Sequence, residues 1–374
     1  MKQRRLFIDW MRGLAVLCMI EHHSFDAWLK PELHGSAYDR LFRFLGGVAA
    51  PSFLFLAGLA IVLMLEGQLA KGVGRSAAAW GAAKRGGLIF LGAYLFRFQE
   101  WALAFGAAPA TDLLRIDVLN AIGIGLILVS LLWGALPSLP ARAVGFAVAA
   151  GLVAALAPVV WSASLSGVPQ IVSDYLRGKP PRALFPLFPW TAHAFAGALV
   201  GLGFARVRRA ANPVKAEAQY VLGWLAGGSI VLWFATRFLD GLPGQLYSQL
   251  DWWQTSPAYF LLRTCSSIWI LAGCWAVERA FAPFWSRLPA GPLVTLGRHS
   301  LIIYWVHVEL VYGRWFWRSR GHLDLQTAAL CFLAVLLSQI ALAYSIVPVS
   351  GWLKFRLAKQ RTAPQKAPQL SLGA

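Results

Sequence analysis

Ionisable side chains occur inside apolar segments of this sequence, where a buried charge is costly and therefore points to function. The densest set lies within residues 6–24 and comprises Asp9, Arg12, Glu21, His22 and His23. Arg12 and His23 are eleven residues apart, so in a helix they share one face and lie about 16 Å apart along the axis. Asp9 precedes Arg12 by one turn and can neutralise it. Because histidine exchanges protons near neutral pH, this line predicts a proton-transfer group at its outer end.

Two other histidines are expected at a similar depth. His193 lies about one turn into an apolar run over residues 186–204, and His307 lies inside a run over residues 293–312. In the topology deduced below, both belong with His23 to the outer half of the membrane. Three imidazoles at one level predict a polar cavity that opens outward.

Arg263 is the other cation inside a predicted span. It either binds an acidic group of a substrate or pairs with Glu100, Asp112 or Glu309, and the sequence leaves these alternatives open. The outer loop after the first span adds His34 as a further candidate.

The composition indicates a membrane protein. Of the 374 residues, 58% are hydrophobic and only 13% are charged, whereas soluble domains are nearer one quarter charged. We predict an all-α, polytopic transmembrane helix bundle of about ten spans. The predicted spans are residues 6–24, 45–65, 86–105, 116–136, 142–161, 186–204, 220–239, 258–280, 293–312 and 328–348.

The distribution of positive charge predicts the orientation. Alternate loops carry about 20 Lys and Arg residues on one side and about 12 on the other, and the richer side faces the cytoplasm. Both termini are therefore expected to be cytoplasmic. The net charge of +18 is spread over these loops, which argues against a nucleic-acid partner and for the lipid bilayer. The four cysteines lie in apolar runs without metal-ligand spacing, so we expect no metal.

Two regions are predicted along the chain. Residues 1–353 form the transmembrane domain, and residues 354–374, which are basic and contain proline, form a disordered cytoplasmic tail. No Walker motif, dinucleotide fingerprint or strong internal repeat is present.

Four stretches, in this order along the chain, carry a resemblance to a known family: residues 6–23, 51–58, 185–190 (with Gly197 and Gly201) and 296–307. Together they resemble bacterial relatives of heparan-α-glucosaminide N-acetyltransferase, in the transmembrane acyltransferase superfamily. The resemblance covers about residues 5–350. The Arg12–His23 spacing also resembles that of the wider acyltransferase 3 family.

The resemblance implies an enzyme of the bacterial inner membrane. It would take an acyl group, expected to be acetyl, from cytoplasmic acetyl-CoA or another acyl-CoA. The acceptor would be a hydroxyl or amine of a periplasmic or cell-surface saccharide. A homodimer is left open.

The resemblance also assigns roles to residues. His23 becomes the expected catalytic histidine and Arg12 its partner on the donor path, whereas the pattern of the lysosomal enzyme points, by spacing from Arg12, to His34. Either histidine would act as a general base on the acceptor hydroxyl or amine, which then attacks the thioester. Candidates for stabilising the oxyanion are His307, Tyr304 and Arg263. We assign CoA binding to Arg12, Lys84, Arg85 and Arg298, and substrate binding to Asp9, His193, Arg263, Tyr304 and Glu309.

Two other function classes fit the same residues. A proton-coupled transporter or permease of a small solute would also use buried histidine and arginine. The lack of evident inverted repeats and of paired broken helices argues against it. A non-catalytic membrane scaffold is the third reading.

Overall fold

The computed structural model describes residues 5–106, 108–178, 182–239, 246–281, 284 and 291–362. Within these ranges the secondary structure is helical and contains no β-strand, which confirms the predicted all-α class. The helices are α1 (Leu6–Trp28), α2 (Ala37–Gly46), α3 (Ala49–Leu69), α4 (Arg75–Leu103), α5 (Val118–Ala135), α6 (Leu139–Ser162), α7 (Gln170–Leu176), α8 (Leu187–Val207), α9 (Pro213–Ala218), α10 (Gly228–Leu239), α12 (Pro257–Ala280), α14 (Pro292–Arg298), α15 (Ser300–Tyr312) and α16 (Leu325–Thr362). A π-helical stretch, Gln219–Gly227, joins α9 to α10.

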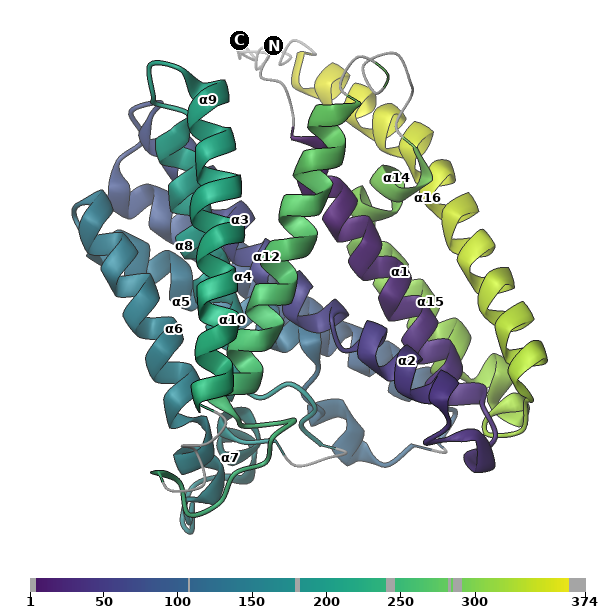
Figure 1. Cartoon of the computed structure of the whole chain (residues 1–374). Coiled ribbons are helices and arrows are strands. Elements are labelled where there is room, and N and C mark those ends of the chain that lie inside the picture. The colour runs from purple at the N-terminus through teal and green to yellow at the C-terminus, as the bar shows by residue number, and fades with distance from the viewer. Residues whose placement is uncertain are drawn as a thin grey trace, which may run out of the picture.

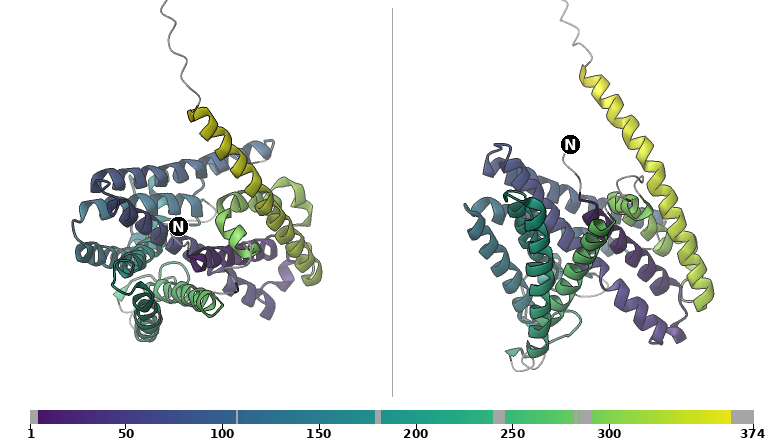
Figure 2. Two further views of the ribbon diagram at one scale, coloured as in Figure 1. Left: turned by 90° about the horizontal axis from the view of Figure 1, so that it is seen from above. Right: turned by 45° about the horizontal axis from the view of Figure 1, so that its top comes forward.

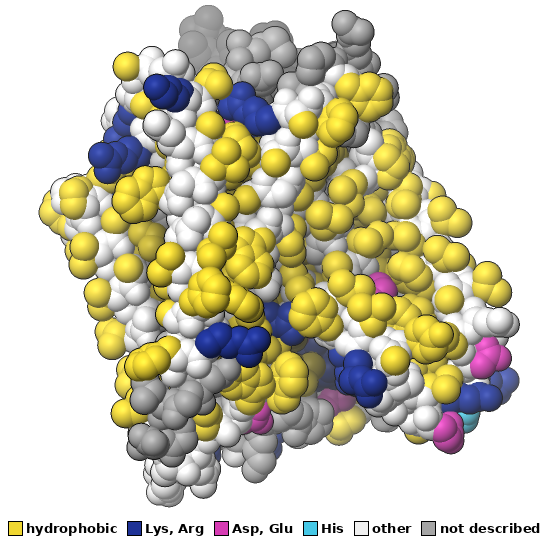
Figure 3. Space-filling model, in the orientation of Figure 1, with side chains coloured by type: hydrophobic (Ala, Val, Ile, Leu, Met, Phe, Trp, Pro, Cys, Tyr) yellow, Lys and Arg dark blue, Asp and Glu magenta, His cyan; other side chains and the backbone are white. Residues whose placement is uncertain are grey.

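Several of these helices can cross a membrane. In the described ranges, seven are long and apolar enough to span a bilayer, and α15 is a shorter apolar helix. The chain is therefore an integral membrane protein. Hydrophobic side chains cover the middle of the face in Figure 3, and most charged side chains on it gather toward the two ends.

The count of ten spans remains a prediction. Helices α1 and α4 contain 23 and 29 residues, which is long enough to cross about 30 Å of hydrocarbon. Both contain charged residues singled out in the sequence analysis, such as Arg12 in α1 and Lys84 in α4. These charges lower their hydropathy below that of the seven apolar helices.

The first turn of α1 and the C-terminal end of α16 lie at the same end of the molecule (Figure 1). This arrangement agrees with an even number of spans, whereas the side of the membrane on which that end lies remains a prediction. Helix α16 extends past the rest of the bundle (Figure 2) and continues to Thr362. Residues 363–374 of the predicted tail lie outside the described residues.

The run predicted as one span over residues 293–312 is two helices. Helix α14 ends at Arg298, and α15 begins at Ser300. Between them, His299 has φ −108° and ψ 17°, which lies outside the helical region. Residues 297–300, Gly-Arg-His-Ser, interrupt the apolar run at this point, and the predicted span continued across them.

Glycines allow two helix pairs to approach closely. A Cβ on Gly58 of α3 would overlap the carbonyl oxygen of Ala194 on α8, and one on Gly197 would overlap that of Phe55. Small residues serve in this way at helix contacts within membranes. The α3–α8 contact fixes the first turns of α8, which carry His193.

Helix α1 is held in a similar way. A Cβ on Gly13 would overlap the carbonyl oxygen of Leu293, and one on Gly297 would overlap that of Asp9, so α1 and α14 touch through their backbones. Glu278 of α12 accepts hydrogen bonds from the backbone N–H groups of Leu6 and Phe7, at 3.3 and 2.7 Å. It thereby caps the N-terminus of α1, which lacks a side-chain cap of its own.

Candidate active site

A cavity of about 1130 Å³ opens at the end of the bundle opposite the first turn of α1. Its walls come from the C-terminal half of α1, the α2–α3 junction, the ends of α4 and α15, and the first turns of α5, α8 and α12. This volume is that of a typical small-molecule site. The sequence candidates that line it are His23, His193, Arg263, Tyr304 and Glu309.

His23 and His307 form a hydrogen-bonded pair at the wall of this cavity. Nδ1 of His23 lies 2.8 Å from Nε2 of His307, and the two rings are inclined by only 7°. His23 lines the cavity, and His307 lies behind it with 0% of its surface exposed. The two residues come from α1 and α15, 284 positions apart in the chain.

The surroundings of His307 determine which nitrogens of the neutral pair carry protons. Nδ1 of His307 lies 2.9 Å from the carbonyl oxygen of Ile303. Because a carbonyl oxygen can only accept, this Nδ1 carries the proton, and Nε2 of a neutral ring is then an acceptor. His23 must therefore donate from its Nδ1. Its Nε2 is left with a lone pair and is the basic atom of the pair.

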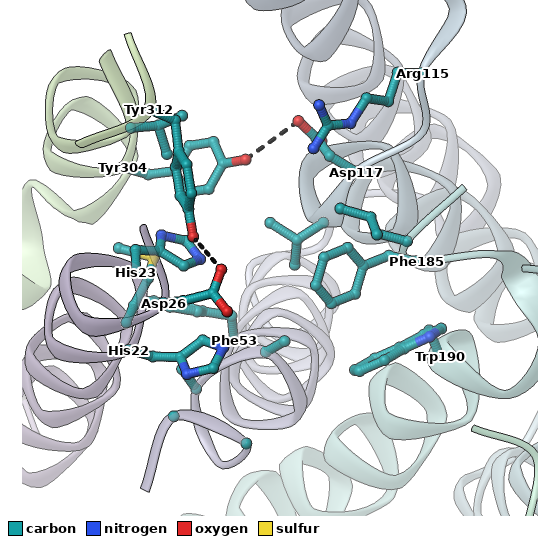
Figure 4. Close-up of a pocket in the computed structure, with 18 of the residues that line it drawn as sticks. His22, His23, Asp26, Phe53, Arg115, Asp117, Phe185, Trp190, Tyr304 and Tyr312 are labelled. Atoms are coloured by element: carbon teal, nitrogen blue, oxygen red, sulfur yellow. Dashed lines mark hydrogen bonds between the residues drawn. The ribbon is translucent and has the colours of Figure 1, made fainter. Parts of the chain in front are cut away.

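Tyr312 and Asp26 flank His23 (Figure 4). The Tyr312 ring packs edge-on against the His23 ring, with centroids 5.3 Å apart, and its hydroxyl donates to Oδ2 of Asp26 at 3.1 Å. A negative charge thus lies beside the ring that would accept a proton. We did not assign Asp26 from the sequence, although its spacing of three residues from His23 puts it on the same helix face.

A second tyrosine–carboxylate pair joins α15 to the start of α5 (Figure 4). Tyr304 donates from its hydroxyl to Oδ2 of Asp117 at 3.2 Å. The same oxygen accepts from Nη2 of Arg97 at 2.7 Å, and Arg97 also pairs with Glu100. Oδ1 of Asp117 caps α5 by accepting from the N–H of Leu119. The single hydroxyl proton of Tyr304 is therefore engaged.

Arg97 and Asp117 were missed as site residues, although the sequence contained a signal for both. Arg97 lies inside the predicted span 86–105, so the rule that singled out Arg263 applied to it as well. Asp117 and Asn120 have the spacing of a helix N-cap and its N3 partner. That spacing marks a helix N-terminus, whereas the contact of Asp117 with Arg97 depends on the tertiary structure.

His193 lies on another part of the wall, on α8. Its Nδ1 lies 3.2 Å from the hydroxyl of Thr264 on α12, and its ring packs against Phe260 at 4.8 Å and Trp190 at 6.3 Å between centroids. Arg263, also on α12, lines the cavity beside them. Aromatic rings together with polar groups are typical of surfaces that bind sugars and other small molecules.

Glu309 lines the cavity but has a protein partner. Its Oε1 accepts from Nε2 of Gln99 on α4 at 2.9 Å, and the side-chain oxygen of Gln99 accepts from the indole N–H of Trp305. Glu309 thus connects α15 to α4 at the edge of the cavity.

Arg12, Asp9 and Arg298 form a separate cluster that does not line the cavity. Asp9 is buried and accepts from Nη1 of Arg12 at 3.5 Å and from Nε of Arg298 at 3.3 Å. The two arginines therefore share its single negative charge. Arg298 is the last residue of α14, beside the backbone contact at Gly297.

The remaining candidates also lie outside the cavity lining. His34 lies between η1 (Pro31–Leu33) and α2, where its Nδ1 is 3.3 Å from Oδ1 of Asp39 and 3.1 Å from Nη2 of Arg43. Lys84 lies over the Trp80 ring on α4, and Arg85 contacts Sδ of Met64. His34 therefore lies outside the cavity that His23 lines.

Comparison with known proteins gives a family. The family model described as heparan-alpha-glucosaminide N-acetyltransferase, catalytic, matches residues 4–236, which include α1, α8 and the cavity-lining part of α4. No protein in a search of curated proteins matches the chain. In the described ranges, no group of three or more His, Cys, Asp or Glu residues is placed to hold a metal ion. With its membrane-spanning helices and most of its length covered by the match, the chain belongs to the family of heparan-alpha-glucosaminide N-acetyltransferase catalytic domains, which are acetyltransferases.

Proposed function

We propose that this protein transfers an acyl group, expected to be acetyl, from cytoplasmic acyl-CoA to a hydroxyl or amine of a saccharide on the other side of the membrane. The observation that carries the proposal is the His23–His307 pair at the wall of the cavity. Its basic atom belongs to a cavity-lining residue, and its partner is fully buried. This is the arrangement of a general base and the group that orients it.

The proposed reaction needs one base and no redox chemistry. The acceptor O–H or N–H gives its proton to Nε2 of His23 while the oxygen or nitrogen attacks the thioester carbonyl carbon. The C–S bond then breaks, and the CoA thiolate takes the proton back from the His23 imidazolium. The products are the acylated acceptor and free CoA. Asp26, which follows His23 by three residues on α1 and accepts from Tyr312, is proposed to favour the charge of the imidazolium as it forms.

The hydrogen bonds narrow the roles of the sequence candidates. Both nitrogens of His307 are engaged, by Ile303 and His23, so we assign His307 to positioning His23. Tyr304 donates its proton to Asp117, and we assign it to shaping the cavity wall instead of stabilising an oxyanion. His193 and Arg263 then belong to the acceptor side of the cavity.

The donor would reach His23 from the opposite end of α1. Arg12 and Arg298, with Lys84 and Arg85, are the proposed contacts of the CoA phosphates. Between Arg12 and the cavity, α1 is packed, with Val16 0% exposed and grouped in the core with Leu296. Delivery of the acyl group therefore requires movement of side chains in this packed region.

The proposed setting is the inner membrane of a bacterium, with ten spans and both termini in the cytoplasm. The common end of α1 and α16 and the excess of Lys and Arg in loops on one side support this orientation.

A transporter remains the second candidate, because α14 and α15 form a discontinuous helix in contact with the buried histidine pair. Broken helices and buried histidines recur at transport sites. Proteoliposomes with an imposed pH gradient test this function: solute uptake that follows the gradient and needs no acyl-CoA would favour the transporter.

The enzyme proposal is tested first by ligand binding. Purified protein in detergent is heated with acetyl-CoA, CoA or ATP, and the midpoint of unfolding is recorded. We expect saturable stabilisation by acetyl-CoA and CoA and a weaker response to ATP. A saccharide screen for acceptor-dependent release of the CoA thiol then follows. The proposal is contradicted if the unfolding midpoint of folded protein does not rise with millimolar acetyl-CoA or CoA.

A further inference from the structure

Arg263 is a cation buried in the cavity wall without an acidic partner among the described residues. Only 4% of its surface is exposed. Its Nε donates to the hydroxyl of Tyr259 at 2.9 Å and its Nη1 to the carbonyl oxygen of Phe44 at 3.4 Å. Its Cζ lies 4.9 Å from the centre of the Tyr259 ring and 5.5 Å from that of Phe44. The guanidinium is therefore held in place by neutral groups alone.

The carboxylates that line the same cavity are mostly engaged elsewhere. Asp117 and Glu100 pair with Arg97, Asp26 accepts from Tyr312, and Glu309 accepts from Gln99. In the parts of the chain that the structure describes, none lies at ion-pair distance from Arg263. A buried charge without a counter-ion is costly, and the cavity is the side from which a counter-ion can arrive.

The backbone beside Arg263 places its guanidinium near His23. A Cβ on Gly46 would overlap the ring of His22, and a Cβ on Gly47 would meet Nη2 of Arg263. Since these glycines are neighbours in the chain, the His22 ring and the guanidinium lie within roughly 12 Å of each other. The His22 ring is in turn 5.9 Å from the His23 ring. One elongated ligand can reach both Arg263 and the basic nitrogen.

We propose that Arg263 is the subsite for an anionic group, a carboxylate or phosphate, on the acceptor saccharide. This inference rests on the proposed function, because it concerns the molecule that His23 deprotonates. Arginine suits the role, since its planar fork binds such groups in bidentate fashion. The aromatic rings of Tyr259, Phe260 and Trp190 on the same wall suit the faces of a sugar ring.

Binding to the full chain in detergent tests the subsite without turnover. The probes are glucuronate and glucose 6-phosphate, with glucose as the neutral match, at constant ionic strength. Unfolding midpoints give the affinity for wild type, Arg263→Gln, Arg263→Lys and Arg314→Gln. Arg314 is a matched control because it lines the same cavity at an exposed position, where it donates to the carbonyl oxygen of Ala104. Arg263→Lys keeps the charge and covers the case in which the Gln variant does not fold.

We expect an anionic sugar to stabilise wild type saturably and glucose to do so much less. Arg263→Gln should raise the Kd of the anionic sugar by about tenfold or more, Arg263→Lys should raise it less, and Arg314→Gln should leave it nearly unchanged. His23→Ala should bind the probe like wild type. If transfer is absent while binding depends on Arg263, the enzyme proposal fails and the subsite stands.

Several outcomes overturn the subsite. One is wild-type protein that does not respond to either anionic sugar. Another is an equal response in both Arg263 variants and wild type. A third arm uses nanodiscs: an Arg263-dependent response to phosphatidylglycerol over phosphatidylcholine, without a response to the sugars, assigns the site to a lipid headgroup. If Arg263→Gln loses the stabilisation by CoA and keeps that by the sugars, Arg263 belongs to the donor site.

Discussion

Two buried groups of charges lie at opposite ends of the bundle and differ in how fully they are satisfied. At the end away from the cavity, Oε1 of Glu66 accepts from Trp133 and Arg142, at 2.9 and 2.8 Å, and its Oε2 accepts from Arg209 at 2.8 Å. Both carboxylate oxygens are engaged, and Arg142 also lies over the Trp133 ring. This cluster ties α3, α5 and α6 together and does not line the cavity described above.

The cavity end also contains buried ionisable side chains, but two of them keep an unsatisfied group. His23 keeps an unprotonated nitrogen at the cavity wall, and Arg263 keeps its charge without a carboxylate among the described residues. A closed set of hydrogen bonds stabilises the fold, whereas an unsatisfied atom at a cavity is available for a ligand. Within this bundle, an ionisable group with an unsatisfied atom at a cavity is therefore a better indicator of function than a buried charge alone.

The largest expected effect comes from removing the open nitrogen. His23→Ala should reduce acceptor-dependent CoA release by about 10²- to 10⁴-fold and leave the unfolding midpoint close to that of wild type. Thiol release under saturating acetyl-CoA gives the rate. His34→Ala is the matched control, since His34 lies outside the cavity lining. If His34→Ala is inactive and His23→Ala is active, the pattern of the lysosomal enzyme applies.

The closed cluster should respond in the opposite way. Glu66→Ala leaves buried cations without their carboxylate, and we expect a loss of about 3–5 kcal/mol in the free energy of unfolding. Activity per folded molecule should change little. Denaturant or thermal midpoints measure the loss, with the exposed Glu32 replaced by Ala as a control. A large loss of activity without a loss of stability would erase the distinction between the two ends.

The partner of the base should have an intermediate effect. His307→Phe keeps a planar ring but removes the acceptor for Nδ1 of His23. The His23 ring then loses the contact that fixes its orientation, and we expect about a 10- to 100-fold decrease in kcat. KM for the acceptor should stay nearly constant, because His307 does not line the cavity. His322→Phe, at an exposed position, is the control. An unchanged kcat would show that His23 needs no orienting partner.

The smallest effect concerns the contact that positions α1. Gly297→Ala puts a Cβ against the carbonyl oxygen of Asp9, and the α1–α14 pair must separate, at a cost of about 1–3 kcal/mol. Gly273→Ala is the control: nothing lies within 4 Å of its added Cβ, and alanine favours a helix by up to about 1 kcal/mol over glycine. Equal unfolding midpoints for the two variants would contradict the close contact.

Most of the helices could be predicted from the sequence, because a helix that crosses lipid needs a long apolar run. The predicted span 116–136 became α5 (Val118–Ala135), and the predicted span 258–280 became α12 (Pro257–Ala280). The break at His299 was missed because a window of span length averages over the short Gly-Arg-His-Ser interruption at residues 297–300. Hydropathy reports burial in lipid and does not report backbone dihedral angles.

The site was accessible only in part. Depth arguments placed His23 and His307 at one level, but the hydrogen bond between them joins residues 284 positions apart. The choice of partner depends on how α1 and α15 rotate about their axes, which an apolar pattern does not specify. Asp117 was overlooked because a carboxylate is ordinary at a helix N-terminus. Asp26 was overlooked because it fell in the outer loop predicted after residue 24.

Helix α1 also fixes the distance between Arg12 and His23. It is unbroken from Leu6 to Trp28, so Arg12 and His23 are about 16 Å apart along its axis and only about 20° apart around it. A molecule that contacts both must be long and narrow, and a compact acyl donor would reach only one of them. Inserting a single residue between them would turn His23 by about 100° away from His307. The length of this helical segment thus sets a minimum size for any one substrate that touches both ends.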